Sequence, residues 1–166
     1  NGFDFILGNP PYVRLKNLNE ETKLLLKNWE VCRTGLTDLY IPFFQIGIDN
    51  LAPNGILGFI TMNSFFKSLN GRSLRDYFTE KSLKFKIIDF GSDQIFKSKN
   101  TYTCICLIEN RRQNFIEYTE SFNYNLNDAK TFDRVYYRNL NSKKGWNLKD
   151  HERITRIENI GTPFNE

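Results

Sequence analysis

An asparagine, two prolines and a tyrosine stand together near the start of the chain, as Asn9-Pro10-Pro11-Tyr12. Proline fixes φ and lacks an N–H group, so this segment is stiff and extended and offers carbonyl acceptors but few donors. The side chain of Asn9 adds a further acceptor, its oxygen Oδ1. Two acceptors held rigidly a short distance apart suit a ligand with two hydrogens on one nitrogen, which is a planar amino group.

The motif could make such an amino group reactive. The nitrogen of a nucleobase amine or of an amide is a poor nucleophile because its lone pair is delocalised. Hydrogen bonds to Asn9 Oδ1 and the Pro10 carbonyl would favour a pyramidal nitrogen, and they strengthen as positive charge develops. The ring of Tyr12 offers a stacking surface, which contributes about 1–3 kcal/mol per base. The alternative is a proline-rich turn that closes a strand, with Tyr12 packed on the surface.

The apolar residues Phe3 to Leu7 predict a strand directly before the motif. The motif therefore lies at the carboxyl end of a strand, where open α/β sheets bind their ligands. A short helix is predicted over 19–28, with Asn19 as its N-cap. A longer helix is predicted from Thr37 or Asp38, and its apolar residues on more than one face indicate packing on both sides.

Further along, the turn signal Ala52-Pro53-Asn54-Gly55 precedes a predicted strand over 56–62. A helix over 73–80 and strands over 85–90 and 101–108 follow. Because strands and helices alternate at first, those strands should be parallel, whereas the last two, with no helix between them, can pair antiparallel. Short strands are also predicted at two later places, 115–118 and 134–137.

The composition limits the function classes. The chain has 166 residues and a formal net charge of +4, which predicts one sheet-based domain and permits an anionic partner. Its three cysteines show no C-x-x-C pair, and His151 is the only histidine, so we expect no metal site. We expect no membrane span and no secretory signal, and hence a cytoplasmic protein. The start without Met, almost at a strand, predicts a boundary inside a longer protein.

Taken together, these blocks resemble the adenine-N6 DNA methyltransferases of restriction-modification systems with the TaqI type of layout, which use S-adenosylmethionine. The resemblance covers about Phe3 to Glu109. It rests on F-D-F-I-L-G-N-P-P-Y, D-L-Y-I-P-F-F at 38–44, A-P-N-G-I-L-G-F-I at 52–60 and Q-I-F-K-S-K-N-T-Y-T-C-I-C-L-I at 94–108. It implies an α/β fold: a partial Rossmann-like methyltransferase sheet, mostly parallel with an antiparallel C-terminal hairpin, and helices on both faces.

The resemblance also implies roles for individual residues. Asn9 and the Pro10 carbonyl would bind the target amine, and Tyr12 and Phe96 would contact a flipped adenine from two sides. Phe43, together with Asn9, would lie at the cofactor. Phosphates of double-stranded DNA would meet four basic residues, whose simpler interpretation is a solvated helix face: Arg72, Arg75, Lys97 and Lys99.

The resemblance further predicts the domain organisation. Residues 1–110 would be the C-terminal half of the catalytic domain, and 111–166 an extra β and irregular segment that leads to a target recognition region. The glycine-containing cofactor loop and the acidic residue for the ribose are not found in the sequence. We therefore expect this chain to be inactive alone and to depend on an upstream cofactor-binding segment and a downstream recognition domain of the same parent chain. Any nuclease of a type II restriction enzyme would also lie outside these residues.

Other functions remain open from the sequence. A glutamine-N5 protein methyltransferase uses the same motif, because the lone pair of its target amide nitrogen is also delocalised. A base-flipping RNA methyltransferase is a similar alternative. A DNA-binding module without catalysis is an alternative from a different class, supported by the missing cofactor loop. The intact Asn9-Pro10-Pro11-Tyr12 argues against that module, which has no need of it.

Overall fold

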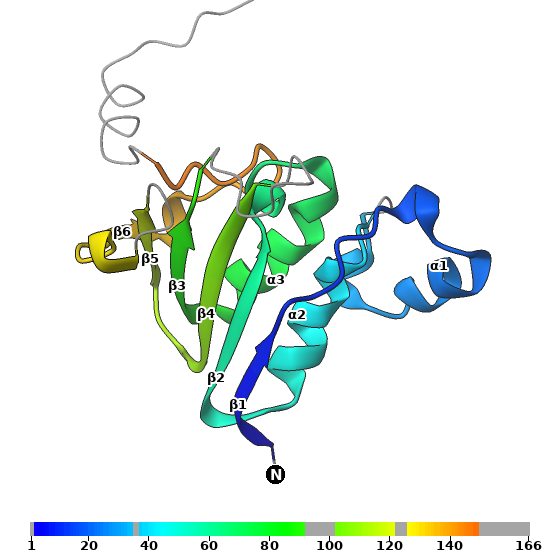
Figure 1. Cartoon of the computed structure of the whole chain (residues 1–166), viewed down its shortest axis with the longest axis horizontal. Helices are drawn as coiled ribbons and strands as arrows, with labels where there is room; N and C mark the ends of the chain where they lie inside the picture. Colours follow the sequence, from blue (N-terminus) through cyan, green and yellow to red (C-terminus); the bar gives the residue numbers. More distant parts are fainter. Residues whose placement is uncertain (1, 35–36, 92–101, 122–125, 150–166) are drawn as a thin grey trace, which may run out of the picture.

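A computed structural model describes residues 2–34, 37–91, 102–121 and 126–149 (Figure 1). These residues form a sheet of six strands in the order β1-β2-β4-β3-β5-β6. The strands are β1 (Phe3–Gly8), β2 (Leu51–Met62), β3 (Leu83–Asp89), β4 (Thr103–Arg112), β5 (Phe115–Glu120) and β6 (Asp133–Tyr136). The α-helices are α1 (Glu20–Leu26), α2 (Tyr40–Asp49) and α3 (Arg72–Lys81).

Strand directions confirm the predicted α/β class. β1 pairs parallel with β2, and β3 pairs parallel with β5. β4 is antiparallel to both β2 and β3, so it lies between them, and β6 is antiparallel to β5. Consequently β1, β2, β3 and β5 all run in one direction, and the predicted antiparallel hairpin is the pair of β3 and β4.

Both α2 and α3 cover the same face of the sheet (Figure 1). The chain moves across the sheet in one direction from β1 to β2 to β3, and right-handed crossovers that advance in one direction place their helices on one side. The described residues place no helix on the opposite face, which differs from the prediction of helices on both faces. On that opposite face Leu7 of β1 and Leu107 of β4 are exposed.

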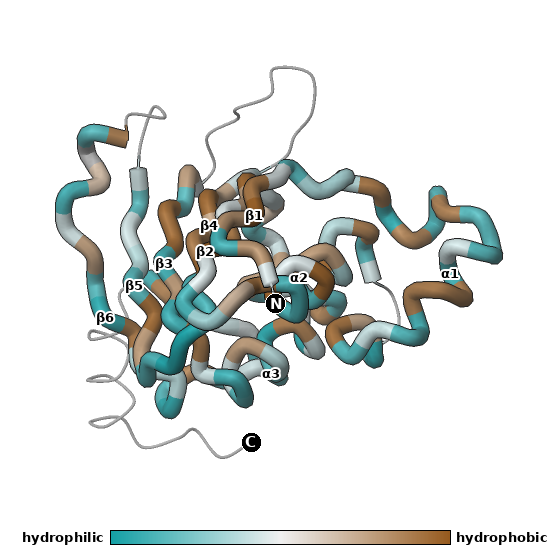
Figure 2. The backbone as a smooth tube through the Cα atoms, turned by 90° about the horizontal axis from the view of Figure 1, so that it is seen from below, coloured by the Kyte–Doolittle hydropathy of each residue, from teal (hydrophilic) through white to brown (hydrophobic). Residues whose placement is uncertain are grey.

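An aromatic cluster holds the helices to the sheet. Phe44 of α2 packs edge to face on Phe59 of β2 and on Phe78 of α3, with ring centroids 5.4 Å apart in each pair. Phe78 also contacts Phe85 of β3 at 4.9 Å. Figure 2 shows hydrophobic residues concentrated along the central strands. Burial of these rings supplies most of the favourable free energy that keeps the site's elements in place.

The helix predictions are largely confirmed. Asn19 caps α1, because its Oδ1 accepts from Thr22 N–H at 2.9 Å. α3 covers the predicted range and one further residue at each end. The predicted turn at 52–55 instead lies within β2, as an irregularity in its register with β1. Asn54 takes a positive φ of 63° there, so the chain bends without leaving the sheet.

The sheet continues past the predicted boundary at residue 110. That residue lies inside β4, and β5 and β6 add to the same sheet. That the following residues lead to a target recognition region stays a prediction. In the described part of the chain, no helix is long and apolar enough to cross a membrane. The same residues contain no group of His, Cys, Asp and Glu side chains that could hold a metal ion.

Candidate active site

The Asn9–Tyr12 motif follows β1 directly and lies beside the carboxyl end of β2. The parallel register pairs Gly8, the last residue of β1, with Phe59 of β2. The hydroxyl of Tyr12 then donates to the carbonyl oxygen of Ile60 at 3.0 Å. The motif is therefore at the carboxyl edge of the sheet, as predicted from the strand that precedes it.

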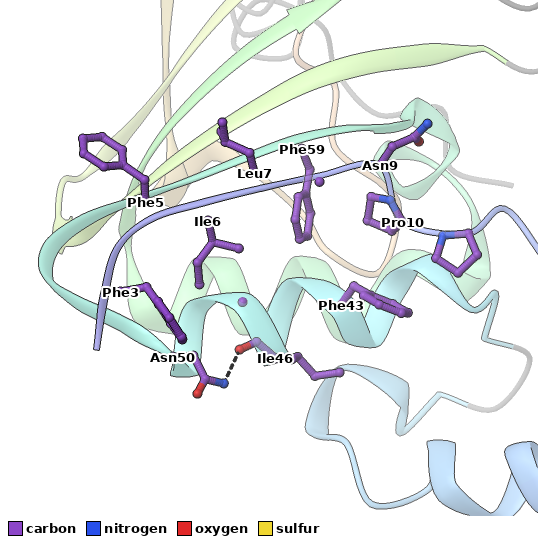
Figure 3. Close-up of a pocket in the computed structure, with 13 residues that line it drawn as sticks. Phe3, Phe5, Ile6, Leu7, Asn9, Pro10, Phe43, Ile46, Asn50 and Phe59 are labelled. Atoms are coloured by element: carbon purple, nitrogen blue, oxygen red, sulfur yellow. Dashed lines mark hydrogen bonds between the residues drawn. The ribbon is translucent and has the colours of Figure 1, made fainter. Parts of the chain in front are cut away.

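Both acceptors expected to bind an amino group lack partners among the described residues. Asn9 is exposed, and no described group forms a hydrogen bond with its side chain. Figure 3 shows this side chain pointing away from α2. The Pro11 carbonyl accepts from Val13 N–H at 3.0 Å, whereas no such bond reaches the Pro10 carbonyl within the described ranges. Pro10 is buried as a residue and lines an apolar cleft.

Tyr12 is held as a neutral, half-buried ring. Burial is the main cause that raises the pKa of its hydroxyl to about 12, and the nearby thiols Cys104 and Cys106 raise it further. The hydroxyl therefore stays protonated near neutral pH and continues to donate to Ile60. This bond limits rotation of the ring, which also packs against the hydrophobic core.

Two hydrogen bonds tie the loop after the motif to the start of α2. Leu39 N–H donates to the Val13 carbonyl at 2.9 Å. The carboxylate of Asp38 accepts from the backbone N–H of Leu15. Burial raises the pKa of Asp38, and this hydrogen bond opposes only part of that effect. The sequence analysis named Asp38 only as a possible helix start and gave it no role at the site. Its place in D-L-Y, just before a predicted helix, was the available signal.

An apolar cleft opens between β1 and α2, with a volume of about 690 Å³. Phe43 and Ile46 of α2 form one wall, Ile6 lies opposite, and Pro10 and Pro11 close one end (Figure 3). Asn9 also lines the cleft. The structure thus places Asn9 and Phe43, which the sequence analysis expected at a cofactor, along the same cleft.

The residues that line this cleft fit only part of S-adenosylmethionine. Phe43, Ile46 and Pro10 offer the flat apolar contacts that an adenine ring requires. No acidic side chain lines the cleft. The ribose hydroxyls would therefore find no carboxylate among the residues that line this cleft.

The prediction that Arg75 contacts DNA is wrong. Its side chain is fully buried, and its guanidinium donates to the carbonyls of Phe65, Ser68 and Ser142. Burial lowers the pKa of Arg75. With its donors directed at carbonyls inside the protein, Arg75 cannot also bind a phosphate on the surface.

Arg72, one turn earlier on α3, is partly exposed, so a phosphate contact stays a prediction for this residue. The remaining predicted DNA contacts, Phe96, Lys97 and Lys99, lie outside the described residues. The sequence analysis also missed a polar group near the ends of β2, β3 and β5, formed by the partly buried Asn63 and the buried Asp89 and Tyr118. Polar residues directly after apolar strands were the signal for the first two.

Known proteins resemble this chain in sequence and in fold. The family model described as Eco57I restriction-modification methylase matches residues 1–96. The type II restriction enzyme and methyltransferase RM.Eco57I of Escherichia coli is 34% identical over 121 residues, which cover 71% of this chain and 12% of that protein.

Two solved structures share the fold. The ATP-dependent type ISP restriction-modification enzyme LlaBIII, bound to DNA, matches with a TM-score of 0.62 and 20% identity over 86% of this chain and 12% of that one. A class I S-adenosylmethionine-dependent methyltransferase from Listeria monocytogenes matches with a TM-score of 0.54 and 20% identity, over 72% of this chain and 37% of that one.

The chain thus spans a small part of the length of the relatives it matches, 12% for the Escherichia coli protein. The family match nevertheless covers more than half of the chain, from residue 1 to residue 96, and includes the Asn9–Tyr12 motif, α2 with Phe43 and the whole of β2. On this match, the chain belongs to the Eco57I restriction-modification methylase family.

Proposed function

We propose that this chain is part of a DNA methyltransferase that transfers a methyl group from S-adenosylmethionine to N6 of a flipped adenine in double-stranded DNA. One observation carries the proposal: two acceptors, Asn9 Oδ1 and the Pro10 carbonyl, have no hydrogen-bond partner among the described residues, and both residues line an apolar cleft. The family membership supports methyl transfer within a restriction-modification system.

Asn9 and Pro10 would act on the amine directly. Each accepts one N6 hydrogen, which draws the nitrogen out of conjugation with the ring and returns its lone pair for attack on the methyl carbon. Bound S-adenosylmethionine would supply the methyl carbon to this nitrogen, with the electron pair of the carbon–sulfur bond left on sulfur. The product nitrogen then releases one proton to water, because an amide or peptide carbonyl is too weak a base to retain it.

Tyr12 would bind the extruded base. A base outside the duplex has lost its stacking partners, and an aromatic ring replaces part of that interaction. The hydrogen bond of Tyr12 to Ile60 fixes the ring before the base arrives. Less conformational freedom is then lost on binding.

S-adenosylmethionine supplies the electrophilic methyl group when it is bound. Phe43 and Pro10 would hold one side of its adenine in the cleft between β1 and α2. The polar remainder requires groups from the upstream segment of the parent chain. We therefore propose that residues 1–166 do not bind the cofactor usefully alone.

Exposed apolar side chains support the dependence on further parts of the parent chain. Phe3, Phe5 and Leu7 of β1 are 63%, 70% and 79% exposed. β1 also lies at the edge of the sheet, so one side of its backbone has no partner strand among the described residues. Apolar edge strands are normally covered, because they otherwise pair with other chains.

The test is a methyl transfer assay with the full parent protein, labelled S-adenosylmethionine and double-stranded DNA. The proposal predicts label on adenine N6, and no label with residues 1–166 alone. Label on RNA or on a glutamine of a protein substrate would support one of the alternative methyltransferases instead. DNA binding without label on any substrate would support the non-catalytic module.

A further inference from the structure

Two exposed cations, Arg14 and Lys16, follow the Asn9–Tyr12 motif in the chain. Arg14 is two residues from Tyr12, so their Cα atoms are at most about 7 Å apart. The loop that carries both cations leaves the carboxyl end of β1 and passes α2 on its way to α1 (Figure 1). The two residues therefore lie at the edge of the sheet that carries the motif.

The backbone around Arg14 is held on both sides. On one side, Leu39 N–H donates to the Val13 carbonyl at 2.9 Å. On the other side, Leu15 N–H donates to the carboxylate of Asp38. The side chain of Leu15 also packs against the hydrophobic core, whereas that of Arg14 is exposed. Because both neighbours are fixed, little backbone freedom remains to be lost when Arg14 binds a ligand.

Lys16 lies in a short 3-10 helix, Leu15–Asn17, that is anchored in the same way. Asn17 N–H donates to the Arg14 carbonyl at 2.9 Å, which closes the turn between the two cations. Leu18, directly after the turn, packs against the hydrophobic core, and Lys16 is left exposed. The two cations therefore project from one closed turn of the backbone.

Neither cation is neutralised by the part of the protein that the structure describes. No described carboxylate forms an ion pair with Arg14 or Lys16, whereas two cations farther along the same loop are paired: Lys23 with Glu20 at 2.7 Å and Arg33 with Glu30 at 3.8 Å. Burial raises the pKa of Asp38, and the charge of Arg14 opposes a smaller part of that rise than the Leu15 bond does. Arg14 and Lys16 thus remain available to an anionic partner.

We propose that Arg14 and Lys16 bind phosphates of double-stranded DNA beside the nucleotide on which the Asn9–Tyr12 motif acts. This inference rests on the proposed function, which supplies the anion. Phosphates flank every nucleotide, so a base brought to the motif brings phosphates to the residues that directly follow it. The planar guanidinium of Arg14 can bind two phosphate oxygens at once, and Lys16 acts as a point charge. Such contacts orient DNA without reading its sequence.

The test measures DNA binding by the full parent protein over a range of salt concentrations. Arg14→Met and Lys16→Met each remove one cation and keep an apolar stem. Arg112→Met is the matched control, because Arg112 is also exposed and forms no ion pair with a described residue. Arg112 ends β4, which is antiparallel to β2, so it lies at the opposite edge of the sheet. Urea unfolding shows that each variant is folded.

Arg14→Met and Lys16→Met should each reduce the slope of log affinity against log salt by about 0.9, and lower DNA affinity about threefold to tenfold. The loss should be similar for unrelated DNA sequences. At saturating DNA, kcat should stay within about twofold of the unmodified protein, because neither side chain touches the reacting atoms. Arg14→Lys should restore the slope but only part of the affinity, because it keeps the charge and loses the fork.

The outcomes separate this inference from the proposed function. Slopes in Arg14→Met and Lys16→Met equal to that of Arg112→Met, in a parent protein that methylates adenine, would overturn the inference alone. Reduced slopes in a parent protein that transfers no methyl group to adenine would support the DNA contact and overturn the proposed function. A parent protein that does not bind DNA would overturn both.

Discussion

The hydroxyl of Tyr12 donates to the carbonyl oxygen of Ile60 at 3.0 Å and so joins the loop after β1 to the end of β2. These residues are far apart in sequence, and the bond anchors the aromatic ring that follows Asn9 and Pro10 in the chain. A stacking surface and an amine-binding pair are thereby held in one place. The following predictions depend on this arrangement.

Two substitutions of Tyr12 distinguish the role of its hydroxyl, which is bound to Ile60, from the role of its ring in stacking. Tyr12→Phe keeps the ring but loses the bond to Ile60, and we expect the KM for DNA to rise about threefold to tenfold. Tyr12→Ala also loses the stacking surface, so its KM for DNA should exceed that of Tyr12→Phe by a further factor of about ten or more. Steady-state kinetics of the parent protein measure both. Equal effects of the two substitutions would contradict a stacking role for the ring.

The same hydroxyl predicts a loss of stability at high pH. Its pKa is about 12 in the folded protein and 10.0 ordinarily, so folding favours the protonated form. The resulting stabilisation is complete below pH 10.0 and disappears as the pH rises through about 12. Urea unfolding across this range should show a smaller loss of stability for Tyr12→Phe than for the unmodified protein. Parallel losses in the two proteins would contradict the prediction.

Phe43 and Phe44 are neighbours on α2 with different expected roles. Phe43 lines the cleft, whereas Phe44 is fully buried in the aromatic cluster. Phe43→Ala should weaken S-adenosylmethionine binding to the parent protein and change stability little. Phe44→Ala should cost about 3–5 kcal/mol of unfolding free energy. Calorimetry for binding and chemical denaturation for stability distinguish them, and unchanged cofactor affinity in Phe43→Ala would remove Phe43 from the site.

Substitution of Arg75 should lower stability, whereas substitution of Arg72 should weaken DNA binding. Arg75→Met leaves the carbonyls of Phe65, Ser68 and Ser142 without this donor and should cost about 3 kcal/mol or more of stability. The salt dependence of DNA binding should stay unchanged in this variant. Arg72→Met should instead reduce the slope of log affinity against log salt by about one, if Arg72 meets a phosphate. A reduced slope in a folded Arg75→Met protein would restore Arg75 as a DNA contact.

The exposed side chains of β1 predict self-association of residues 1–166. Leu7→Lys places a charge on the uncovered face of the edge strand and should reduce association at high concentration. Leu24→Lys is the matched control, because Leu24 is also exposed, at 60%, but lies on α1. Sedimentation velocity measures both variants. Equal association of the unmodified chain and Leu7→Lys would mean that β1 is not the contact.

Local patterns predicted the elements around the site well. The apolar run before Asn9 indicated β1, and Asn19 indicated the start of α1, because each feature depends on neighbours in sequence. The insertion of β4 between β2 and β3 was not predicted, since it depends on pairing between distant residues. The spacing of strands and helices alone does not fix that order.

Hydrogen bonds between residues that are remote in sequence also explain why the sequence analysis was wrong about Arg75 and missed Asn63. Arg75 is in a basic stretch, so its sequence context indicated a surface, but its guanidinium binds Ser142, which is remote in sequence. The bonds of Asn63 to Asp89 and Tyr102 join three separate segments in the same way. The roles expected for Asn9, Pro10, Tyr12 and Phe43 stay predictions, although the structure brings these residues close together.

The most direct measurement is methyl transfer to adenine N6 by the parent protein with Asn9 replaced. Asn9→Ala removes one of the two acceptors and should lower kcat by about 10²-fold or more, with DNA affinity nearly unchanged. Asn9→Asp retains an acceptor oxygen and should keep more activity than Asn9→Ala. Transfer to adenine N6 by Asn9→Ala at the rate of the unmodified protein would contradict the account.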